Sequence, residues 1–376
     1  MRRWAQKIDF ALILLVGILL LFGLMILCSA STAGTGAAPS DAYYYVKKQL
    51  AWVFAGLVVM IGMCSFDYHV LGQYHRLIYL GTLVSLAAVL VLGRNVSGSQ
   101  RWFLIGPARI QPAEFAKIGI VISLAKHLEK KEQLEGFADL LSAFVHVGLP
   151  MLLILKQPDF GTAMVFGGVL LGMLFMAGAS PRHLAIIGAS AVGALSIATW
   201  LSVAGILPIL APHQVSRIVV FLDPYADRTG AGWNVIQSMI AIGSGGLFGK
   251  GLFNGTQAQL NFLPAHHTDF IFSVVGEELG FLGAFTLLAL YLLLLWRGLR
   301  IMVLAKDDFG ANLAAGVVSM LVFHLVINIG MTLGVMPVTG IPLPFVSYGG
   351  SSLITNMAGI GLLLNVHMRR HKITFR

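Results

Sequence analysis

Long apolar runs, separated by short polar segments, make up most of the chain. Each run is long enough to cross a bilayer as a helix rising about 1.5 Å per residue. The pattern predicts ten membrane-spanning helices, over residues 10–30, 50–66, 77–92, 112–128, 140–155, 161–179, 184–207, 270–296, 310–336 and 345–367. The fourth is the least certain of the ten, because Glu114, Lys117 and Lys126 interrupt it. We therefore expect an all-α integral membrane protein, with residues 1–376 forming a single polytopic membrane domain.

The composition supports this fold class and excludes others. Hydrophobic residues make up 57% of the chain and charged residues 11%, with a mean hydropathy of +0.84, a balance that soluble globular domains do not have. The net charge of +9 does not indicate nucleic-acid binding, because the basic residues are scattered through short loops. The two cysteines, Cys28 and Cys64, end successive spans and so lie on opposite membrane faces, which argues against a disulfide.

Charge asymmetry between the loops predicts the topology. The first apolar run is too long for a signal-peptide core, so we expect it to stay uncleaved. With the N-terminus inside, ten spans place both termini in the cytoplasm. Most of the 25 lysines and arginines then fall on the inner side, as the positive-inside rule requires.

This topology makes residues 207–268 a long extracytoplasmic loop between the seventh and eighth spans, and a loop of that length is usually functional. Within it, residues 234–242 (NVIQSMIAI) have apolar positions at helical spacing and predict a helix along the membrane surface. Residues 243–251 (GSGGLFGKG) resemble a phosphate loop, but Gly251 stands where Ser or Thr must follow Lys250. We interpret that segment as flexible backbone.

The stretch 263–280, LPAHHTDFIFSVVGEELG, carries the strongest chemical signal. Asp269 lies at the mouth of the eighth span, and Glu277 and Glu278 follow about 12 Å deeper along a helix. Ionisable groups at that depth are costly, so they mark either a function or a buried partner. Capping of the helix by Asp269 is the alternative for that residue. A metal site that combines it with the two preceding histidines would have poor ligand geometry, with three ligands in four positions.

Other charged residues map to the same outer face. Glu114 and Lys117 are three residues apart on one helical face, so they form either a structural ion pair or a ligand site. Asp159 lies in KQPDFGT between two spans, where an aspartate often caps a helix. Arg101 and Arg109 lie in the connection before the fourth span.

The last outer connection, residues 337–352 (PVTGIPLPFVSYGGSS), is broken by prolines and glycines. Broken backbone at membrane depth is tolerated where it lines a cavity. The start of the tenth span is rich in hydroxyls and glycines and predicts an anion-binding helix N-terminus, with Ser347, Gly349, Gly350 and Ser351 as candidate substrate-binding residues. A re-entrant turn packed against its neighbours is the alternative. Together these groups suit a substrate with an anionic head and a lipid tail.

Four motifs resemble the SEDS family of the bacterial cell wall. They are QPAEFAKI (111–118), KQPDFGTA (156–163), LPAHHTDFIFSVVGEELG (263–280) and PLPFVSYGGSS (342–352), in family order over essentially the whole chain. FLDPYADRTGAGWNVIQS and GTQAQLNFLP resemble RodA, the elongation member, more than FtsW, the division member. Asn261 and Ala265 depart from RodA-like sequences, which carry Glu at both positions. His266 is also unusual at its position.

The resemblance implies a peptidoglycan glycosyltransferase of the bacterial inner membrane that polymerises lipid II during cell elongation and rod-shape maintenance. It places the essential acid at Asp269 and polar cavity residues at Glu114, Lys117 and Asp159. As a general base, Asp269 would take the proton from the 4-hydroxyl of the acceptor sugar, and undecaprenyl diphosphate would leave the donor. The expected partners are lipid II, the growing glycan strand, a class B penicillin-binding protein and other proteins of the elongation complex.

Neutralisation of the leaving diphosphate stays open at this point. There are three candidates. The first is a divalent cation (Mg or Mn), whose ligands the sequence does not identify. The others are the start of the tenth span and the group of Arg101, Arg109 and Lys117. No organic cofactor is expected. A lipid II flippase is the competing function, since ten spans with buried charges also suit a transporter. Against it, the sequence shows no inverted repeat and its acids gather at one face.

Overall fold

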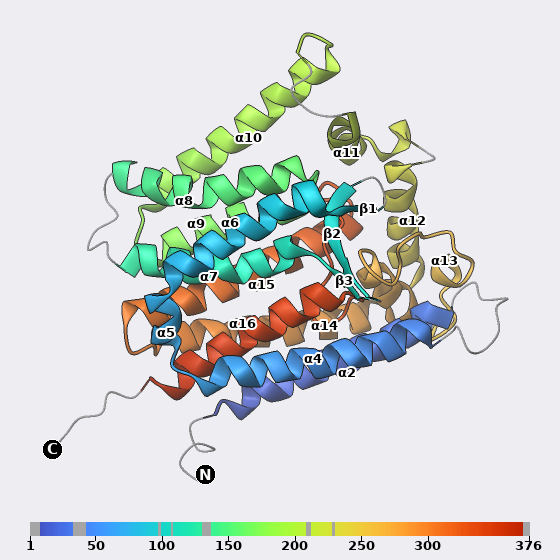
Figure 1. Cartoon of the computed structure of the whole chain (residues 1–376). Coiled ribbons are helices and arrows are strands. Elements are labelled where there is room, and N and C mark those ends of the chain that lie inside the picture. The colour runs from blue at the N-terminus through green and yellow to red at the C-terminus, as the bar shows by residue number, and fades with distance from the viewer. Residues whose placement is uncertain are drawn as a thin grey trace.

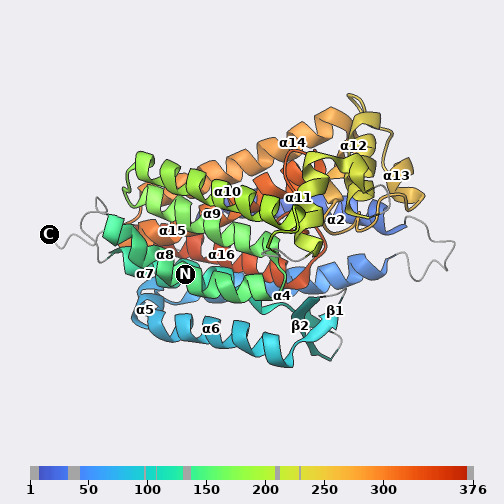
Figure 2. The ribbon, with the colours of Figure 1, turned by 90° about the horizontal axis from the view of Figure 1, so that it is seen from above.

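The computed structural model describes residues 8–32, 43–96, 99–106, 108–129, 137–207, 212–227 and 230–370. Its long helices lie side by side in one bundle (Figures 1 and 2). These helices are α2 (Phe10–Thr32), α4 (Tyr44–Ser65), α6 (His75–Leu92), α7 (Pro112–Glu129), α8 (Phe137–Lys156), α9 (Phe160–Met176), α10 (Pro181–Val203), α14 (Ile271–Val303), α15 (Asp308–Thr332) and α16 (Gly350–Met368). The short α5 (Tyr68–Gln73) joins α4 to α6.

Each of the ten predicted segments overlaps one of these long helices, which confirms the all-α membrane fold. In the described part of the chain, six helices are long and apolar enough to cross a membrane, namely α2, α4, α6, α10, α14 and α15. The apolar parts of α8 and α9 are shorter. The protein is therefore a multi-pass membrane protein, while the count of ten crossings stays a prediction.

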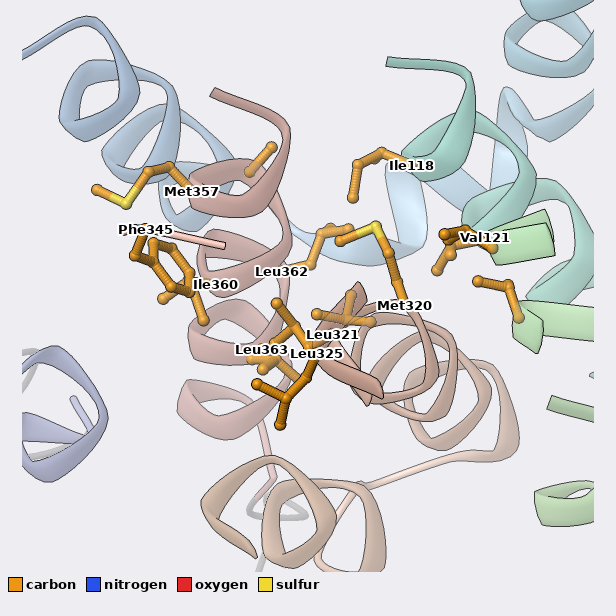
Figure 3. Close-up of a cluster of buried hydrophobic side chains, with 14 of the residues drawn as sticks. Ile118, Val121, Met320, Leu321, Leu325, Phe345, Met357, Ile360, Leu362 and Leu363 are labelled. Carbon is orange, nitrogen blue, oxygen red and sulfur yellow. The ribbon is translucent and has the colours of Figure 1, made fainter. Parts of the chain in front are cut away.

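The centre of the bundle is formed by α7, α15 and α16. In Figure 3, Ile118 and Val121 of α7, Met320 of α15, and Met357 and Ile360 of α16 lie in one apolar cluster. Helices at the periphery instead expose apolar side chains, as α4 and α10 do. An apolar outer surface suits a lipid environment, because the exposed side chains contact acyl chains and not water.

The segment between α10 and α14 contains several short elements. They are α11 (Pro212–Leu222), the 3-10 helix η1 (Pro224–Ala226), α12 (Ala231–Ser244) and α13 (Thr256–Gln259). The helix predicted over residues 234–242 is thus confirmed as α12. It runs across the long helices in Figure 1 and packs on α14. Its position along the membrane surface stays a prediction.

Helix α14 is interrupted where this segment meets it. Gly280 has φ +65°, a left-handed conformation that glycine adopts without steric cost. The N–H groups of Lys250 and Gly251 donate to the carbonyl oxygens of Glu277 and Glu278, at 3.0 and 2.9 Å. On the other side of the break, the N–H groups of residues 281 and 282 donate back to residues 246 and 247.

The prediction of flexible backbone over 243–251 is therefore wrong. These residues supply hydrogen-bond partners to a broken membrane helix, whose backbone groups would otherwise be unsatisfied. Contact is so close that a Cβ on Gly249 would lie 2.1 Å from the carbonyl oxygen of Glu278.

A small antiparallel sheet, not predicted from the sequence, joins α6 to α7. Its strands β1 (Arg94–Val96), β2 (Ser99–Ile105) and β3 (Ala108–Ile110) pair in the order β1-β2-β3. The sheet places Arg101 on β2 and Arg109 on β3. It therefore fixes the height of both cations above the start of α7.

Candidate active site

The turn that carries Asp269 is held through its backbone. The carbonyl oxygen of Asp269 accepts a hydrogen bond from Nδ2 of Asn328 at 2.9 Å. That of Thr268 accepts one from Oγ of Ser347 at 2.6 Å, and the carbonyl before it accepts one from the N–H of Tyr348 at 3.1 Å. Three consecutive carbonyl groups are thus bound by α15 and by the connection before α16, which fixes the direction of the Asp269 side chain.

Asn328 is fully buried and ties this turn to a second one. Its Nδ2 also donates to the carbonyl oxygen of Ile341 at 2.7 Å. The neighbouring Gly340 has φ +72°, and a Cβ there would lie 3.3 Å from Oδ2 of Asp269. The backbone therefore passes directly beside the carboxylate. The sequence analysis missed Asn328, although an amide inside the apolar run 310–336 was a usable signal.

The capping interpretation of Asp269 is wrong. The residue that caps α14 is Phe270, and no side chain accepts a hydrogen bond from the first turn of the helix. Its carboxylate is thus not committed to holding the helix start. That leaves the group available for chemistry at the end of the bundle.

Asp159 has two roles, one of which the sequence predicts. Its Oδ1 accepts from the N–H of Thr162 at 3.1 Å and so caps α9. Its Oδ2 accepts from Nε2 of Gln111 at 2.7 Å and lies 3.5 Å from a guanidinium nitrogen of Arg101. The cap therefore also holds Arg101, whose positive charge lowers the pKa of the Asp269 carboxylate.

Burial raises the pKa of Asp269 to about 6, while the positive charges of Arg101 and Arg217 oppose this shift. The side chain keeps partial solvent exposure. A carboxylate with this pKa is ionised at neutral pH and still basic enough to accept a proton, which suits a general base.

Arg217, on α11, is a site residue that the sequence analysis missed. Its guanidinium faces the carbonyl oxygen of Thr339 at 3.5 Å, and its charge interacts with Asp159 and Asp269. A single cation directly before the apolar segment IVVFL (218–222) of the outer loop was the available signal.

Glu114 and Lys117 form a buried ion pair at 2.8 Å, close to the start of α7. Nζ of Lys117 also contacts Nε2 of His324 at 2.7 Å, and Nδ1 of that ring faces the carbonyl oxygen of Met320. Because a carbonyl only accepts, Nδ1 carries the proton and Nε2 accepts from the ammonium. Glu114 Oε2 is buried without a hydrogen-bond partner among the described residues. Whether the pair contacts substrate stays a prediction.

The hydroxyls and glycines at the start of α16 make close contacts within the protein. Oγ of Ser347 accepts from the N–H of residue 343 at 2.8 Å while it donates to the turn of Asp269. Oγ of Ser351 accepts from the N–H of Gln111 at 3.1 Å. A Cβ on Gly350 would lie 2.3 Å from the ring of Trp52 on α4, whereas one on Gly349 would meet only ordinary contacts. Their role in substrate binding stays a prediction, and so does that of Arg109, which is exposed.

Glu277 and Glu278, both fully buried, have partners in the protein. Glu277 pairs with Lys250 at 2.7 Å and accepts from Oγ1 of Thr256 at 2.9 Å. Glu278 accepts from Oγ of Ser29 on α2 at 2.6 Å. The sequence left two explanations for these buried carboxylates, a function or a buried partner, and the structure supports the buried partner.

A divalent cation finds few protein ligands near Asp269. His266 faces carbonyl oxygens with both ring nitrogens, at 2.8 and 3.0 Å, which leaves neither for a metal. Within the described ranges no three residues of the His, Cys, Asp and Glu types come together. Asp159 and Asp269 both interact with Arg101, and two carboxylates are too few to complete the coordination of a divalent cation. A cation at this position stays a prediction.

Fold and site together define a polytopic membrane protein with a desolvated carboxylate between arginines at one end of its helix bundle. The chain belongs to the cell cycle protein family of FtsW, RodA and SpoVE, whose sequence profile matches residues 10–372. It is 38% identical to the peptidoglycan glycosyltransferase MrdB of Escherichia coli K12, covering 98% of this chain and 95% of that one. It is 36% identical to the peptidoglycan glycosyltransferase RodA of Treponema pallidum, covering 98% and 99%.

Two solved structures resemble the fold closely. One chain belongs to a peptidoglycan synthase complex described for its coordination of polymerization and crosslinking, with a TM-score of 0.80, 36% identity and coverage of 97% of this chain and 99% of that chain. The other is the rod shape determining protein RodA of Thermus thermophilus, with a TM-score of 0.70, 31% identity and coverage of 97% and 98%. The family predicted from the four motifs is thus confirmed.

Proposed function

We propose that this protein is a peptidoglycan glycosyltransferase that polymerises lipid II during cell elongation and rod-shape maintenance. One observation carries the proposal, namely the desolvated carboxylate of Asp269, held by its backbone between Arg101 and Arg217. Relatives that align over almost the whole chain are named peptidoglycan glycosyltransferases.

In the proposed reaction, the 4-hydroxyl of the acceptor sugar loses its proton to the Asp269 carboxylate. The hydroxyl oxygen forms a bond to the anomeric carbon of the donor as the bond from that carbon to the diphosphate oxygen breaks. Undecaprenyl diphosphate takes the bonding electron pair and leaves. A base positioned in this way contributes about 10² to 10⁴-fold to the rate.

Charge on the leaving diphosphate is the second demand of the reaction. Arg101 and Arg217 meet it best, because both lie beside the base and a guanidinium binds phosphate oxygens through paired N–H groups. The charge balance favours this assignment once Asp269 has taken the proton, because Asp159 alone then faces the two arginines and one positive charge is left for the leaving diphosphate. Gly349, Gly350 and Arg109 remain as the alternative cradle.

The proposed setting is the bacterial inner membrane, with both termini in the cytoplasm and Asp269 at the outer face. The positive-inside distribution of the loops supports this orientation. A class B penicillin-binding protein is the proposed partner. Support comes from the similar fold in a synthase complex that coordinates polymerization and crosslinking.

The experiment that tests the function is polymerisation of purified lipid II by the full-length chain, with and without a class B penicillin-binding protein. A β-lactam blocks the partner's transpeptidase, so that uncrosslinked glycan strands, separated on a gel, report glycosyl transfer alone. We expect strands with the complex, and none when its polymerase chain is Asp269→Asn. Transport of lipid II across vesicles without any polymer would overturn the proposal in favour of a flippase.

A further inference from the structure

A cavity of about 280 Å³ lies at the end of the bundle opposite Asp269. It is enclosed by the start of α2 and by the C-terminal ends of α14 and α16. Figure 1 shows α2 beginning and α16 ending on this same side. Neither the proposed reaction nor the turn of Asp269 uses any residue of this cavity.

Positive charge dominates the cavity wall. In the part of the chain that the structure describes, Arg297, Arg300 and Arg370 line it together with a single carboxylate, Asp9. Arg297 is committed to Asp9, with 2.6 Å between guanidinium and carboxylate. Among the described residues, neither Arg300 nor Arg370 is paired with a carboxylate, and the guanidinium of Arg370 contacts the ring of His367. Two positive charges thus remain for a ligand.

The first turn of α2 adds to this field. Phe10 and Ala11 line the cavity at the N-terminal end of a 23-residue helix. Oδ1 of Asp9 already accepts a hydrogen bond from the N–H of Leu12 at 3.1 Å, and the positive end of the helix dipole favours a further anion there. The C-terminal ends of α14 and α16 carry the opposite partial charge, so the arginines decide the sign of the ligand.

Apolar groups at the rim indicate the rest of the ligand. Phe10 and Leu304 line the cavity and are 63% and 45% exposed. Trp296, itself 55% exposed, lies with its ring under Arg300, at 5.9 Å from the guanidinium carbon to the ring centroid. Exposed apolar side chains at the end of membrane helices meet acyl chains, and tryptophan concentrates at the lipid interface. The ligand must therefore combine an anionic head with an apolar body.

We propose that this cavity binds the phosphate headgroup of an anionic phospholipid of the cytoplasmic leaflet. The phosphate lies between Arg300 and Arg370, and the acyl chains leave past Phe10 and Leu304. Basic pockets between helices on the cytoplasmic side suit such headgroups. The leaflet rests on the orientation proposed above, whereas the chemistry of the ligand does not. Bound lipid joins α2 to the ends of α14 and α16 and so stabilises the folded protein.

The test uses the purified full-length chain in a neutral detergent and follows its Tm. Dioctanoyl phosphatidylglycerol is the probe, with dioctanoyl phosphatidylcholine and inorganic phosphate as parallel arms at equal concentrations. We expect a saturable rise in Tm with phosphatidylglycerol alone. An equal rise with phosphatidylcholine, or with inorganic phosphate, would overturn the proposal, because the effect would then come from the acyl chains or from the free anion.

Variants locate the effect. Arg300→Gln and Arg370→Gln should each weaken the apparent Kd for phosphatidylglycerol about fivefold, and the pair about 25-fold. The single variants carry the test if the double variant does not fold. Arg182→Gln is the matched control, because it makes the same charge change at the exposed start of α10, away from the cavity. A double variant that still binds like wild type, or a control that loses as much affinity, would refute the site.

Discussion

At the residue scale, Asp269 combines a fixed backbone with a carboxylate that does not cap its helix. Asn328 and Ser347 hold the carbonyl groups of the turn, so the side chain does not have to stabilise the turn itself. Burial then acts on the carboxylate and raises its pKa to about 6, against the hydrogen bond from Thr268 and the charges of the two arginines. Separating support from chemistry in this way allows the base to be replaced without disturbing the fold.

Asp269→Asn should therefore abolish polymerisation and leave the fold intact. Asparagine has the same size but cannot accept the proton, so we expect the rate to fall about 10² to 10⁴-fold. The measurement is lipid II polymerisation at matched Tm. Asp223→Asn, in the exposed cap of η1, is the control and should keep wild-type activity. Activity of Asp269→Asn within twofold of wild type would remove Asp269 from the mechanism.

The pH profile offers a second test of this residue. A base with a pKa of about 6 is protonated below that pH, so activity should fall as the pH drops through 6. Arg101 lowers this pKa, and Arg101→Gln should therefore move the acidic limb of kcat to higher pH. Arg182→Gln, far from the site, should leave the limb in place. An acidic limb that stays fixed in Arg101→Gln would argue against Asp269 as the titrating group.

The buried pair of Glu114 and Lys117 depends on a third residue. Exchanging the two charges, as Glu114→Lys with Lys117→Glu, keeps the pair but places a carboxylate beside Nε2 of His324. That nitrogen accepts a hydrogen bond in the native arrangement, because Nδ1 already donates to Met320. We expect the exchanged protein to remain strongly impaired in lipid II polymerisation, as each single neutralisation should be. Full activity of the exchanged protein would show that the pair is only structural.

At the element scale, α14 depends on its interruption. Gly280 has a left-handed φ, and a Cβ there would lie 2.3 Å from the N atom of Gly249. Gly280→Ala should separate the segment 245–251 from the helix and destabilise the protein by about 1–3 kcal/mol. Thermal unfolding in detergent measures this. Gly243→Ala in α12, where a Cβ meets nothing within 4 Å, is the control and should be neutral. Equal Tm values for both variants would contradict the close packing at the break.

The long helices were predictable from the sequence because a bilayer requires about 20 apolar residues per span and leaves no other backbone solution. The break at Gly280 was not, since a glycine in an apolar run looks the same whether the helix continues or stops. Among site residues, Asp269 was found because a carboxylate at a span end is conspicuous. Arg217, His324 and Asn328 were missed, because each is a single polar residue whose role depends on a partner far away in the chain.

At the scale of the whole molecule, the two ends of the bundle have different chemistry. One end carries the acids Asp159 and Asp269 together with Arg101 and Arg217, whose charges act on them. The other carries the arginine-rich cavity. The same helices, α14 and α16, begin at the first end and finish at the second, so one bundle presents a reaction site to one membrane face and a lipid-binding surface to the other.

Orientation of the bundle follows from this polarity and can be measured by cysteine labelling. In a chain whose Cys28 and Cys64 are replaced by serine, Leu260→Cys reports the segment before Asp269, and Tyr74→Cys reports the opposite end, between α5 and α6. Both native side chains are strongly exposed, so each new thiol is accessible to reagent. A membrane-impermeant maleimide should label Leu260→Cys in intact spheroplasts. It should label Tyr74→Cys only after the membrane is disrupted.

Detergent-solubilised protein is the control, since both thiols should then react equally. The reverse pattern in spheroplasts would place Asp269 in the cytoplasm, where lipid II that has already crossed the membrane could not reach it. Labelling of both sites in intact spheroplasts would mean that residues 74 and 260 share a face, and the number of crossings between them would then be even. The predicted order puts five spans between these two positions, an odd number, so only labelling on opposite faces agrees with ten crossings.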